Sequence, residues 1–404
     1  MWKNPNKPDF GVLDGLKVVH SATNMAGPMG ATMLADHGAD LIWLENPRIP
    51  DTSRSGIPLT VEIERRNSRT LAVDIPSPEG KEIFRKILED ADIYIEGWKP
   101  GTLAKWGLSD EVLWSWNPKL IIVHVSGYGQ NGDPDYYTRG GYDAIGQAAS
   151  GFMNQNNGAV APFSCDAQAA MYIAFSALAA YYRACKTGVG ESIDCAQVEI
   201  MMRQQLYLSD YATHGRTYGD ESKQSATIAG WGPFTAADGQ DVYVVGIGGN
   251  TMRRGADWLG LKYGSEFNPE GNSIIAKGTP AGDAWDKALA DYIGSVTAAE
   301  AEKELLAHSV PCTRIMTYED VLNTEHWKMR GTFTTYKSNH GFDVNSVAPM
   351  PHMANRPGQV WRAAPSMGMD NEEILKELGY SDEEIAGLYE KGVVNKRPVE
   401  DFRQ

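Results

Sequence analysis

The sequence predicts an α/β protein whose larger domain is built on a parallel sheet. Short apolar segments alternate with helical ones in the first half, at residues 16–22, 39–45, 92–96 and 120–127. Such segments are apolar at nearly every position, as parallel strands buried on both faces are. Strand-helix-strand order repeated this often indicates right-handed crossovers within one sheet. We therefore expect a Rossmann-like sheet, with the large domain built from N- and C-terminal parts, and a separate, smaller α+β domain.

The elements of the first half follow one another closely along the chain. Residues 1–15 are expected to form an extended arm, and Pro28 to open a helix after the first strand. The polar residues 46–70 are expected to be irregular. Further helices are expected over 79–90, 99–107, 109–116, 167–182 and 197–214, with a short strand after Gly190.

The texture of the sequence changes near residue 220, and we expect three parts. These are the N-terminal part of the large domain at 1–220, a small domain at 225–325, and, at 330–404, a linker and a C-terminal part that returns to the large domain. The small domain is expected to hold two strands joined at Asp238-Gly239, helices near 281–293 and 297–307, a strand over 311–316 and a short helix over 317–322. Two short helices close the chain, each beginning after Asp or Ser and ending at Gly.

Composition excludes several classes of protein. A formal net charge of −15 disfavours nucleic acid and anionic membranes as partners, although it does not exclude a basic pocket for an anionic ligand. The four cysteines show no C-x-x-C spacing, which favours a reduced, cytoplasmic setting. No stretch approaches 18 continuous apolar residues, and the first residues have no apolar core of a leader peptide. We expect a soluble protein that is not exported.

One carboxylate stands directly before the most apolar helical segment. Asp166 ends the stretch 162–166, and the run from Ala167 to Tyr182 is apolar on nearly all sides, which indicates a buried helix. The free N–H groups and the dipole of a helix N-terminus favour negative charge there. Position alone leaves two interpretations, a simple N-cap, which is the commoner role, and a catalytic carboxylate.

Other motifs carry weaker signals. Residues 127–132 fit G-x-G-x-x-G after an apolar strand, but Asp133-Pro134-Asp135 follow where a dinucleotide site needs a helix. A glycine-rich turn that lets backbone approach a ligand is favoured instead. The eight histidines show no metal-ligand spacing, so no metal is expected, and no G-x-S-x-G or P-loop is present.

The remaining candidates each have a plain alternative. His20 and His124 lie within apolar strands and are interpreted as core histidines. Cys165 has no evident histidine partner that would make it a nucleophile. The Gly246–Gly249 segment either closes over a ligand or only forms a turn. Lys99 and Lys105 either bind phosphates or are solvated surface lysines.

Taken together, the motifs resemble those of the family III CoA-transferases over nearly the whole chain. The resemblance lies in the order and spacing of Ala26-Gly27-Pro28, Leu34 to Ala39, Lys99-Pro100-Gly101, Ser126 to Gln130, Gly141-Tyr142-Asp143, Thr187 to Asp194, Pro357 to Trp361 and Gly379-Tyr380. It implies an intertwined homodimer, an acyl-CoA and a carboxylic acid as substrates, and neither metal nor permanently bound cofactor.

The resemblance also implies roles for single residues. The family's nucleophilic aspartate falls on Asp166, which would attack the thioester and form an acyl-aspartyl anhydride and then an aspartyl-CoA thioester. Lys99 and Lys105 match basic positions that bind CoA, whereas a further family arginine is Asn46 here, with Arg48 nearby. That departure leaves the adenine and phosphate contacts open. The helix start near Asp166 and the Gly246–Gly249 turn are the candidates for oxyanion donors.

Within the family, the L-carnitine/γ-butyrobetaine branch is the most similar. The similarity lies in LIWLEN, ERRNSRTLAVDI, RPGQVW and GMDNEEIL, and it implies a trimethylammonium acid as acceptor. Aromatic faces hold such cations, so Trp231 is a candidate, unless it is only a core residue. Met25, Tyr142 and Gly248 are the other residues expected to bind substrate.

Three alternatives stay open at this point. The acceptor could be another acid, such as a 2-hydroxy acid, a bile acid or an oxalate-like acid. A related branch racemises α-methylacyl-CoA and carries histidine where Tyr142 stands; tyrosine, with a pKa of about 10, is a poor base at neutral pH. Transfer is therefore favoured over racemisation. The third alternative is a betaine-binding protein without catalytic activity.

Overall fold

The computed structural model describes residues 2–55, 59–161, 163–216 and 227–397. The chain divides into two compact units, Met1–Leu206 with Arg330–Gln404 as unit 1 and Tyr207–Met329 as unit 2. Each unit is described by itself. The expected boundary between 220 and 225 lies outside the described residues, as does Pro162.

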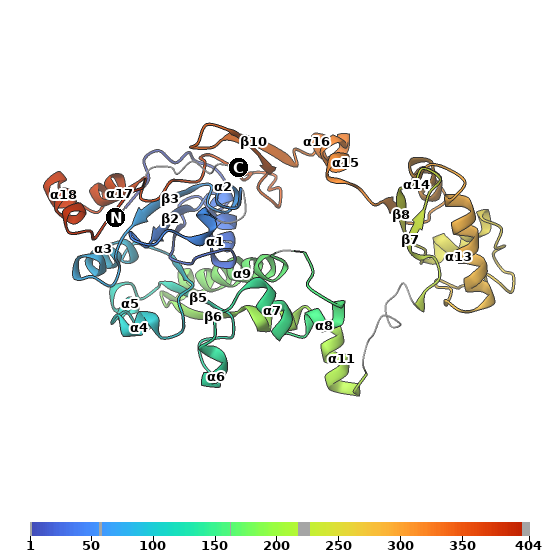
Figure 1. Cartoon of the computed structure of the whole chain (residues 1–404), viewed down its shortest axis with the longest axis horizontal. Coiled ribbons are helices and arrows are strands. Elements are labelled where there is room, and N and C mark those ends of the chain that lie inside the picture. The colour runs from blue at the N-terminus through green and yellow to red at the C-terminus, as the bar shows by residue number, and fades with distance from the viewer. Residues whose placement is uncertain (1, 56–58, 162, 217–226, 398–404) are drawn as a thin grey trace. The chain divides into compact units, whose positions relative to one another are not determined.

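Unit 1 is built on a six-stranded parallel sheet (Figure 1) with the strand order β3-β2-β1-β4-β5-β6. The strands are β1 (Lys17–His20), β2 (Asp40–Glu45), β3 (Ser68–Ala72), β4 (Ile93–Glu96), β5 (Ile121–Ser126) and β6 (Glu191–Ala196). This is a doubly wound order, whose direction reverses between β1 and β4. The expected α/β class with a parallel sheet is confirmed.

Helices cover both faces of this sheet. The helices of unit 1 are α1 (Ala26–Asp36), α2 (Thr60–Glu64), α3 (Pro78–Leu88), α4 (Thr102–Lys105), α5 (Asp110–Trp116), α6 (Pro134–Tyr137), α7 (Asp143–Ala149), α8 (Phe152–Asn156), α9 (Ser164–Thr187), α10 (Gln197–Arg203), α17 (Asn371–Glu377) and α18 (Asp382–Glu390), with a 3-10 turn, η1 (Thr52–Arg54).

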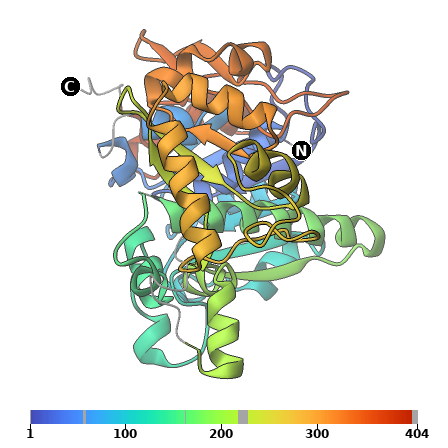
Figure 2. The same cartoon turned by 90° about the vertical axis from the view of Figure 1, so that its right-hand side faces the viewer.

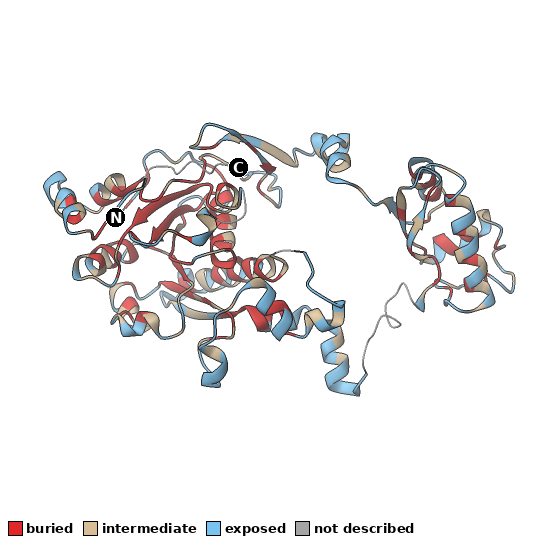
Figure 3. Cartoon of the chain, in the orientation of Figure 1, coloured by how far each residue is buried: buried red, intermediate tan, exposed pale blue. Residues whose placement is uncertain are grey.

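The two faces of the sheet form two separate cores. Val18 and its neighbours pack against α1 and α9, whereas Val19 and its neighbours pack against α3, α5, α17 and α18. This alternation follows from the period of two in a strand. The strands β1, β2, β4 and β5 are buried along nearly their whole length (Figure 3), which explains why the sequence signals them as continuous apolar runs.

The expectation that residues 46–70 are irregular was wrong for the part of this segment after residue 59. α2 and the edge strand β3 lie there, and β3 contains Arg69, which is fully buried. Its guanidinium lies 2.7 Å from Glu377 and 3.1 Å from Glu373 of α17, and 3.6 Å from Asp40 of β2. A charged residue interrupts the apolar run by which a buried strand is recognised in the sequence. The acidic residues that permit the burial of Arg69 come from distant parts of the chain, so the local sequence does not reveal them.

The C-terminal part contributes helices to unit 1, but none of the six sheet strands. The edge strand β3 is covered by the start of α17, where Asp370 and Asn371 accept hydrogen bonds from the backbone N–H groups of Thr70 and Ala72, each at 2.9 Å. The segment after residue 330, where the linker is expected, begins with the antiparallel hairpin β10 (Phe333–Lys337) and β11 (Asp343–Val347).

Helix α9 is buried on one side only. Ala169, Ala170, Ile173 and Ala177 pack against α1 and the sheet, where Gly30 of α1 permits a close helix approach. The other side exposes Met171, Phe175 and Tyr182, at 52%, 72% and 64%. The expectation of burial on all sides is therefore wrong for the single chain, because the alanine-rich composition hides which side faces the core.

Unit 2 holds a three-stranded antiparallel sheet in the order β7-β8-β9, with α13 and α14 packed against it (Figures 1 and 2). Its elements are α11 (Leu206–His214), β7 (Trp231–Thr235), β8 (Asp241–Val245), the π-helix η3 (Thr251–Ala256), α13 (Pro280–Ile293), α14 (Ala298–Ala307), β9 (Cys312–Arg314), α15 (Tyr318–Asn323) and α16 (Glu325–Met329). Gly239 has a φ of +83° in the turn between β7 and β8. Across the described residues of both units, no helix has the length and apolarity to span a bilayer.

Candidate active site

A cleft of about 190 Å³ opens where the parallel strands of unit 1 end. This is the edge of a doubly wound sheet at which ligands bind, beside the reversal of strand order between β1 and β4. Segments that follow four different strands line it, including Thr23, Asn24, Met25, Gly97, Trp98, Lys99, Gly127, Gly141, Tyr142, Asp166 and Gln197. The structure thus brings Asp166, Lys99, Tyr142 and Met25 together at one cleft, and their roles in catalysis and binding stay predictions.

Two glycines shape one wall of the cleft. A Cβ at Gly127 would lie 2.6 Å from the Cα of Gly141, so the two backbones cross in direct contact. The glycine-rich turn after β5 therefore serves a backbone-to-backbone approach. This contact places Tyr142, which caps α7 at the next position, at the edge of the cleft.

Asp166 lies in the first turn of α9, with its side chain buried. It is not the N-cap, because Phe163 occupies that position with a φ of +65°. Its Oδ1 accepts a hydrogen bond from Nε2 of Gln197, the first residue of α10. Among the described residues, nothing hydrogen-bonds its other oxygen, Oδ2, so this oxygen is the one available to a ligand in the cleft.

The capping role that the sequence suggested for Asp166 belongs to Asp143 of α7. Oδ1 of Asp143 accepts hydrogen bonds from the backbone N–H groups of Cys165, at 2.6 Å, and Asp166, at 3.2 Å. Its Oδ2 accepts from Nε2 of the buried Gln147, at 2.7 Å. The two amides at the start of α9 are therefore occupied, and in this arrangement they do not supply the oxyanion donors expected there.

The electrostatics of the cleft set the protonation of Asp166. Burial, followed by the neighbouring negative charge of Asp143, raises the pKa of Asp166 to about 6, against the opposing hydrogen bond from Gln197. The carboxylate is thus poorly solvated yet mostly ionised at pH 7. This combination suits a carboxylate that attacks an electrophilic carbon.

Cys165 does not compete with Asp166 as a nucleophile. Its thiol is buried beside the backbone carbonyl of Gln197, at 3.7 Å, and α7 packs directly on it at Gly146. Burial, with the charges of Asp166 and Asp143, raises the pKa of the Cys165 thiol to about 12. The reactive thiolate is therefore not formed at neutral pH.

Comparison with known proteins decides which chemistry this cleft serves. The family model described as CoA-transferase family III matches residues 13–371. The chain belongs to CoA-transferase family III. It is 36% identical over 397 residues to bile acid CoA-transferase BaiK of Clostridium scindens, which covers 96% of this chain and 90% of that protein. It is 35% identical over 396 residues to L-carnitine CoA-transferase of Proteus mirabilis, covering 96% and 97%.

Solved structures agree on the fold. A CAIB/BAIF family protein from Brucella suis superposes with a TM-score of 0.75 and 24% identity, covering 92% of this chain and 100% of that one. A protein of Mycobacterium tuberculosis gives the same TM-score and coverage at 21% identity. Membership of CoA-transferase family III makes the protein an enzyme that uses CoA thioesters, so the alternative of a binding protein without catalytic activity is set aside.

The basic residues of the transferase fall into two groups. Lys99 is exposed and lines the cleft that contains Asp166, which we name the reaction cleft. Lys105, at the exposed end of α4, and Arg48, whose guanidinium lies 2.7 Å from the carboxylate of Asp74, line neither this cleft nor the second one described below. Their contact with CoA stays a prediction.

A second cleft of about 230 Å³ adjoins the first. It is lined from the end of β2 through η1, including Asn46 at the position of the missing family arginine, and it shares Thr23, Asn24 and Trp98 with the reaction cleft. A ligand longer than either cleft could therefore lie in both, with Trp98 beside it. The described residues of the transferase include no group of three or more histidine, cysteine, aspartate or glutamate side chains arranged to hold a metal.

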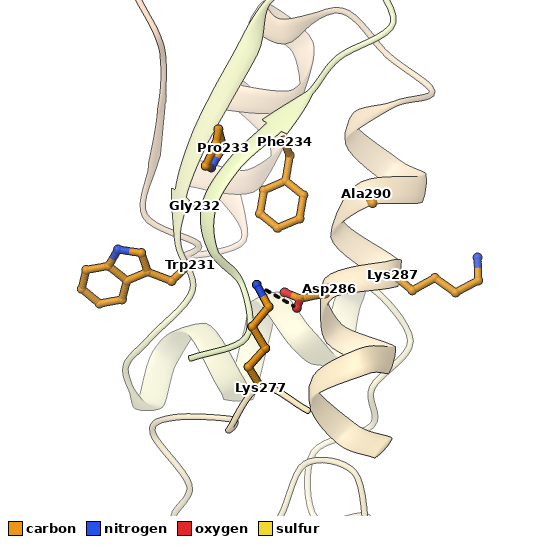
Figure 4. A pocket seen from close by; sticks show the side chains of 8 residues that line it. All are labelled: Trp231, Gly232, Pro233, Phe234, Lys277, Asp286, Lys287 and Ala290. Carbon is orange, nitrogen blue, oxygen red and sulfur yellow. Dashed lines mark ion pairs between the residues drawn. The ribbon is translucent and has the colours of Figure 1, made fainter. Parts of the chain in front are cut away.

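Trp231 and Gly248 belong to unit 2. Trp231 lines a groove between β7 and α13, in which Lys277 faces Asp286 (Figure 4). The ring of Trp231 lies on the opposite side of β7 from the ring of Phe234. Gly248 has a φ of +104°, a conformation that favours glycine at the turn after β8. Gly246, by contrast, makes room for the buried Trp285. The binding of substrate by Trp231 and Gly248 stays a prediction.

Sequence reasoning missed the functional importance of two residues. Asp143 was present only as part of the Gly141-Tyr142-Asp143 motif, and Gln197 was not singled out at all. A signal for Gln197 existed, since it is a polar residue that follows directly on Cys195 and Ala196, the buried end of β6. His20 fits the expected core position, stacked on Trp43 with ring centroids 5.9 Å apart.

Proposed function

We propose that this CoA-transferase moves CoA from an acyl-CoA to a carboxylic acid, with Asp166 as the covalent nucleophile. One observation carries the proposal: the buried carboxylate of Asp166 lines the cleft at the switch point of the sheet, and among the described residues only one of its oxygens has a hydrogen-bond donor, Gln197. A group held in this way loses little freedom on reaching the attacking geometry.

The steps follow from the chemistry of carboxylates and thioesters. An oxygen of Asp166 attacks the thioester carbonyl, the carbon–sulfur bond breaks, and an acyl-aspartyl anhydride and CoA thiolate result. The thiolate then attacks the aspartyl carbonyl carbon, which releases the donor carboxylate and leaves an aspartyl-CoA thioester. The acceptor carboxylate repeats the two steps in reverse order and leaves as the new acyl-CoA, so the thioester energy is conserved without ATP.

The oxyanions that form at each step need hydrogen-bond donors. The amides of Cys165 and Asp166 already donate to Asp143, so they are not free for this role. The turn at Gly246–Gly249 of unit 2 is the remaining candidate from the sequence, but the N–H groups of Gly246, Ile247 and Gly248 already donate to backbone carbonyls of that unit. We propose that the N–H of Gly249 stabilises the developing charge. Lys99, Lys105 and Arg48 are proposed to contact the phosphates of CoA, and the second cleft to take its nucleotide end.

For the acceptor we propose a trimethylammonium acid such as L-carnitine or γ-butyrobetaine. The similarity to the L-carnitine CoA-transferase of Proteus mirabilis supports this proposal. Trp231 is proposed as the aromatic face for the cation, Tyr142 to lie near the acceptor, and Met25 to be a further substrate contact. The similarity to a bile acid CoA-transferase makes a bile acid the main competitor. A racemase is disfavoured because Tyr142, not histidine, stands at the edge of the cleft.

The acceptor is tested by transfer assays with crotonobetainyl-CoA as donor. We expect kcat/KM for L-carnitine or γ-butyrobetaine to exceed that for cholate, lactate and oxalate by about 100-fold, because a site built around a cation discriminates against acids that lack one. Choloyl-CoA with the same acids serves as the matched donor control. Preferred use of cholate would replace the trimethylammonium proposal, and exchange of an α-proton with deuterated water would indicate a racemase.

We also propose a homodimer and a cytoplasmic location. The exposed apolar side chains Met171, Phe175 and Tyr182 of α9 support self-association, and the four free cysteines support a reduced compartment. Light scattering is expected to give twice the chain mass, and Phe175→Glu to shift the protein towards the chain mass. Lys186→Glu, on the last turn of the same helix, is the charge control. A wild-type protein at the chain mass would contradict the dimer.

A further inference from the structure

A network of charged side chains connects β5 to Trp98, the residue that lines both clefts. His124 of β5 stands between two carboxylates, with Nδ1 2.5 Å from Oε1 of Glu96 and Nε2 3.2 Å from both carboxylate oxygens of Asp110. Ser192 of β6 donates a hydrogen bond to Oδ2 of Asp110, at 2.6 Å. Because each ring nitrogen faces an acceptor, both nitrogens donate, which only the doubly protonated ring can do.

The charge of His124 agrees with this arrangement. Burial alone would lower its pKa, but the hydrogen bonds and charges of Asp110 and Glu96 outweigh burial and raise the pKa to about 10. Asp110 is on α5 and Glu96 ends β4, so the imidazolium joins two elements that border the sheet edge. A histidine interpreted as a simple core residue is therefore a buried cation in an extended network.

The far end of the network holds the backbone of the cleft wall. Oε2 of Glu96 accepts a hydrogen bond from the backbone N–H of Trp98, at 2.6 Å. The Trp98 indole N–H donates to Oγ of Ser21, at 3.1 Å, and this hydroxyl also contacts the Tyr94 hydroxyl, at 2.6 Å. Trp98 is thus fixed through both its backbone and its ring.

Trp98 occupies a position where fixed geometry matters. It lines both clefts, and its neighbour Lys99 lines the reaction cleft. Each carboxylate oxygen of Glu96 accepts one hydrogen bond, one from His124 and the other from the backbone N–H of Trp98. The position of the Trp98-Lys99 loop therefore depends on the orientation in which His124 holds the Glu96 carboxylate. Loss of the imidazolium would leave Glu96 as a buried, unbalanced charge that is free to turn away from the loop.

We propose that Glu96, His124 and Asp110 are positioning residues that hold the Trp98-Lys99 loop in the shape that binds the CoA moiety. The proposal rests on the proposed function, since it assigns the two clefts to acyl-CoA. It separates two roles: Asp166 performs the chemistry, and the network shapes the wall beside which the thioester lies. The network acts through the loop and touches no reacting atom.

The test compares His124→Gln with the wild-type enzyme in steady-state kinetics. We expect KM for acyl-CoA to rise about tenfold, with kcat changed less than about threefold, because removing a positioning interaction weakens binding without removing the nucleophile. Asp110→Asn is the second variant, should His124→Gln fold poorly, and is expected to show the same split. His326→Gln, on α16 of unit 2, is the control, expected to leave both constants unchanged.

A pH series supplies a readout that a purely structural role would not give. The folded-state pKa of about 10 lies above the ordinary value of 6.5, so the interaction is fully present below pH 6.5 and is lost as pH rises through 10. Wild-type KM for acyl-CoA should rise over that window, whereas KM of His124→Gln should stay flat across it. The two facing carboxyl groups differ: burial raises the pKa of Glu96, whereas hydrogen bonds from His124 and Ser192 outweigh burial and lower the pKa of Asp110.

Several results would overturn this inference. An unchanged KM in both folded variants would do so, as would a fall in kcat with KM unchanged, or equal pH dependence in variant and wild type. Calorimetric titration with free CoA keeps the test separate from the catalytic proposal. If Asp166 proves not to be acylated but His124→Gln weakens CoA binding, the proposed chemistry fails and the network keeps its role; the reverse pattern removes the network alone.

Discussion

Replacing Asp166 with alanine is expected to abolish CoA transfer and to leave the protein folded. The proposed cycle passes through two intermediates bound covalently to Asp166, and water cannot take the place of this carboxylate without hydrolysing the thioester. We therefore expect kcat to fall by about 10⁴-fold or more. The fold should tolerate the change, because Asp166 does not cap α9 and its burial beside Asp143 is unfavourable for the charged form. Initial rates of acyl-CoA formation measure the first expectation, and circular dichroism the second.

Trapping the intermediate tests the same residue without relying on a rate. Wild-type enzyme incubated with acyl-CoA and hydroxylamine should carry a hydroxamate at Asp166, located by peptide mass spectrometry. The adjacent Cys165→Ala variant is the matched control and should still be labelled, since the Cys165 thiol is buried and its pKa is raised to about 12. Transfer at the normal rate by Asp166→Ala, or a label on another side chain, would refute the role of Asp166.

The fold was predictable where burial is uniform and unpredictable where charge is buried. The strands β1, β2, β4 and β5 are apolar on both faces because helices cover both faces of the sheet. A continuous run of apolar residues in the sequence therefore predicts such a strand. β3 has the same environment, but its Arg69 is neutralised by Asp40 and by Glu373 and Glu377, which lie about three hundred residues further along the chain. Local sequence does not record such a partner.

The site shows the same limit at shorter range. The motif order located Asp166, and the start of a helix suggested that its charge is tolerated there. The sequence could not show that Asp143 rather than Asp166 caps α9, since the contact joins residues 22 positions apart through the crossing of α7 and α9. Gln197 is 31 positions from Asp166, and only the packing of α10 on α9 brings them together. The hydrogen bonds that tune the nucleophile are thus a product of tertiary structure.

Gln197→Leu is expected to reduce transfer at pH 7 by about 10- to 100-fold, the range typical for losing one hydrogen bond that orients a reacting group. Leucine fills a similar volume in the buried site but donates no hydrogen bond to Oδ1 of Asp166. The carboxylate then loses its only side-chain donor among the described residues, and its pKa should rise above about 6. Gln204→Leu, at the end of the same helix, is the matched control and should keep wild-type activity.

The pH dependence gives this prediction its sign. Only the ionised carboxylate attacks, so kcat/KM must fall as pH drops through the pKa of Asp166, near 6 in the wild type. Gln197→Leu should move this acidic limb to higher pH. Asp143→Asn should move it to lower pH, because it removes the neighbouring negative charge while its amide oxygen still accepts from the amides of Cys165 and Asp166.

Opposite displacement by the two variants is the decisive result, because general damage to the cleft cannot produce it. General damage to the cleft lowers the maximal kcat/KM of both variants. It leaves the acidic limb of the pH profile in place or moves it in the same direction in both. Movement in opposite directions requires that Gln197 stabilises, and Asp143 destabilises, one and the same ionised group. If both limbs move together, or neither moves, the group that titrates is not Asp166, and the account of its activation by these two neighbours is wrong.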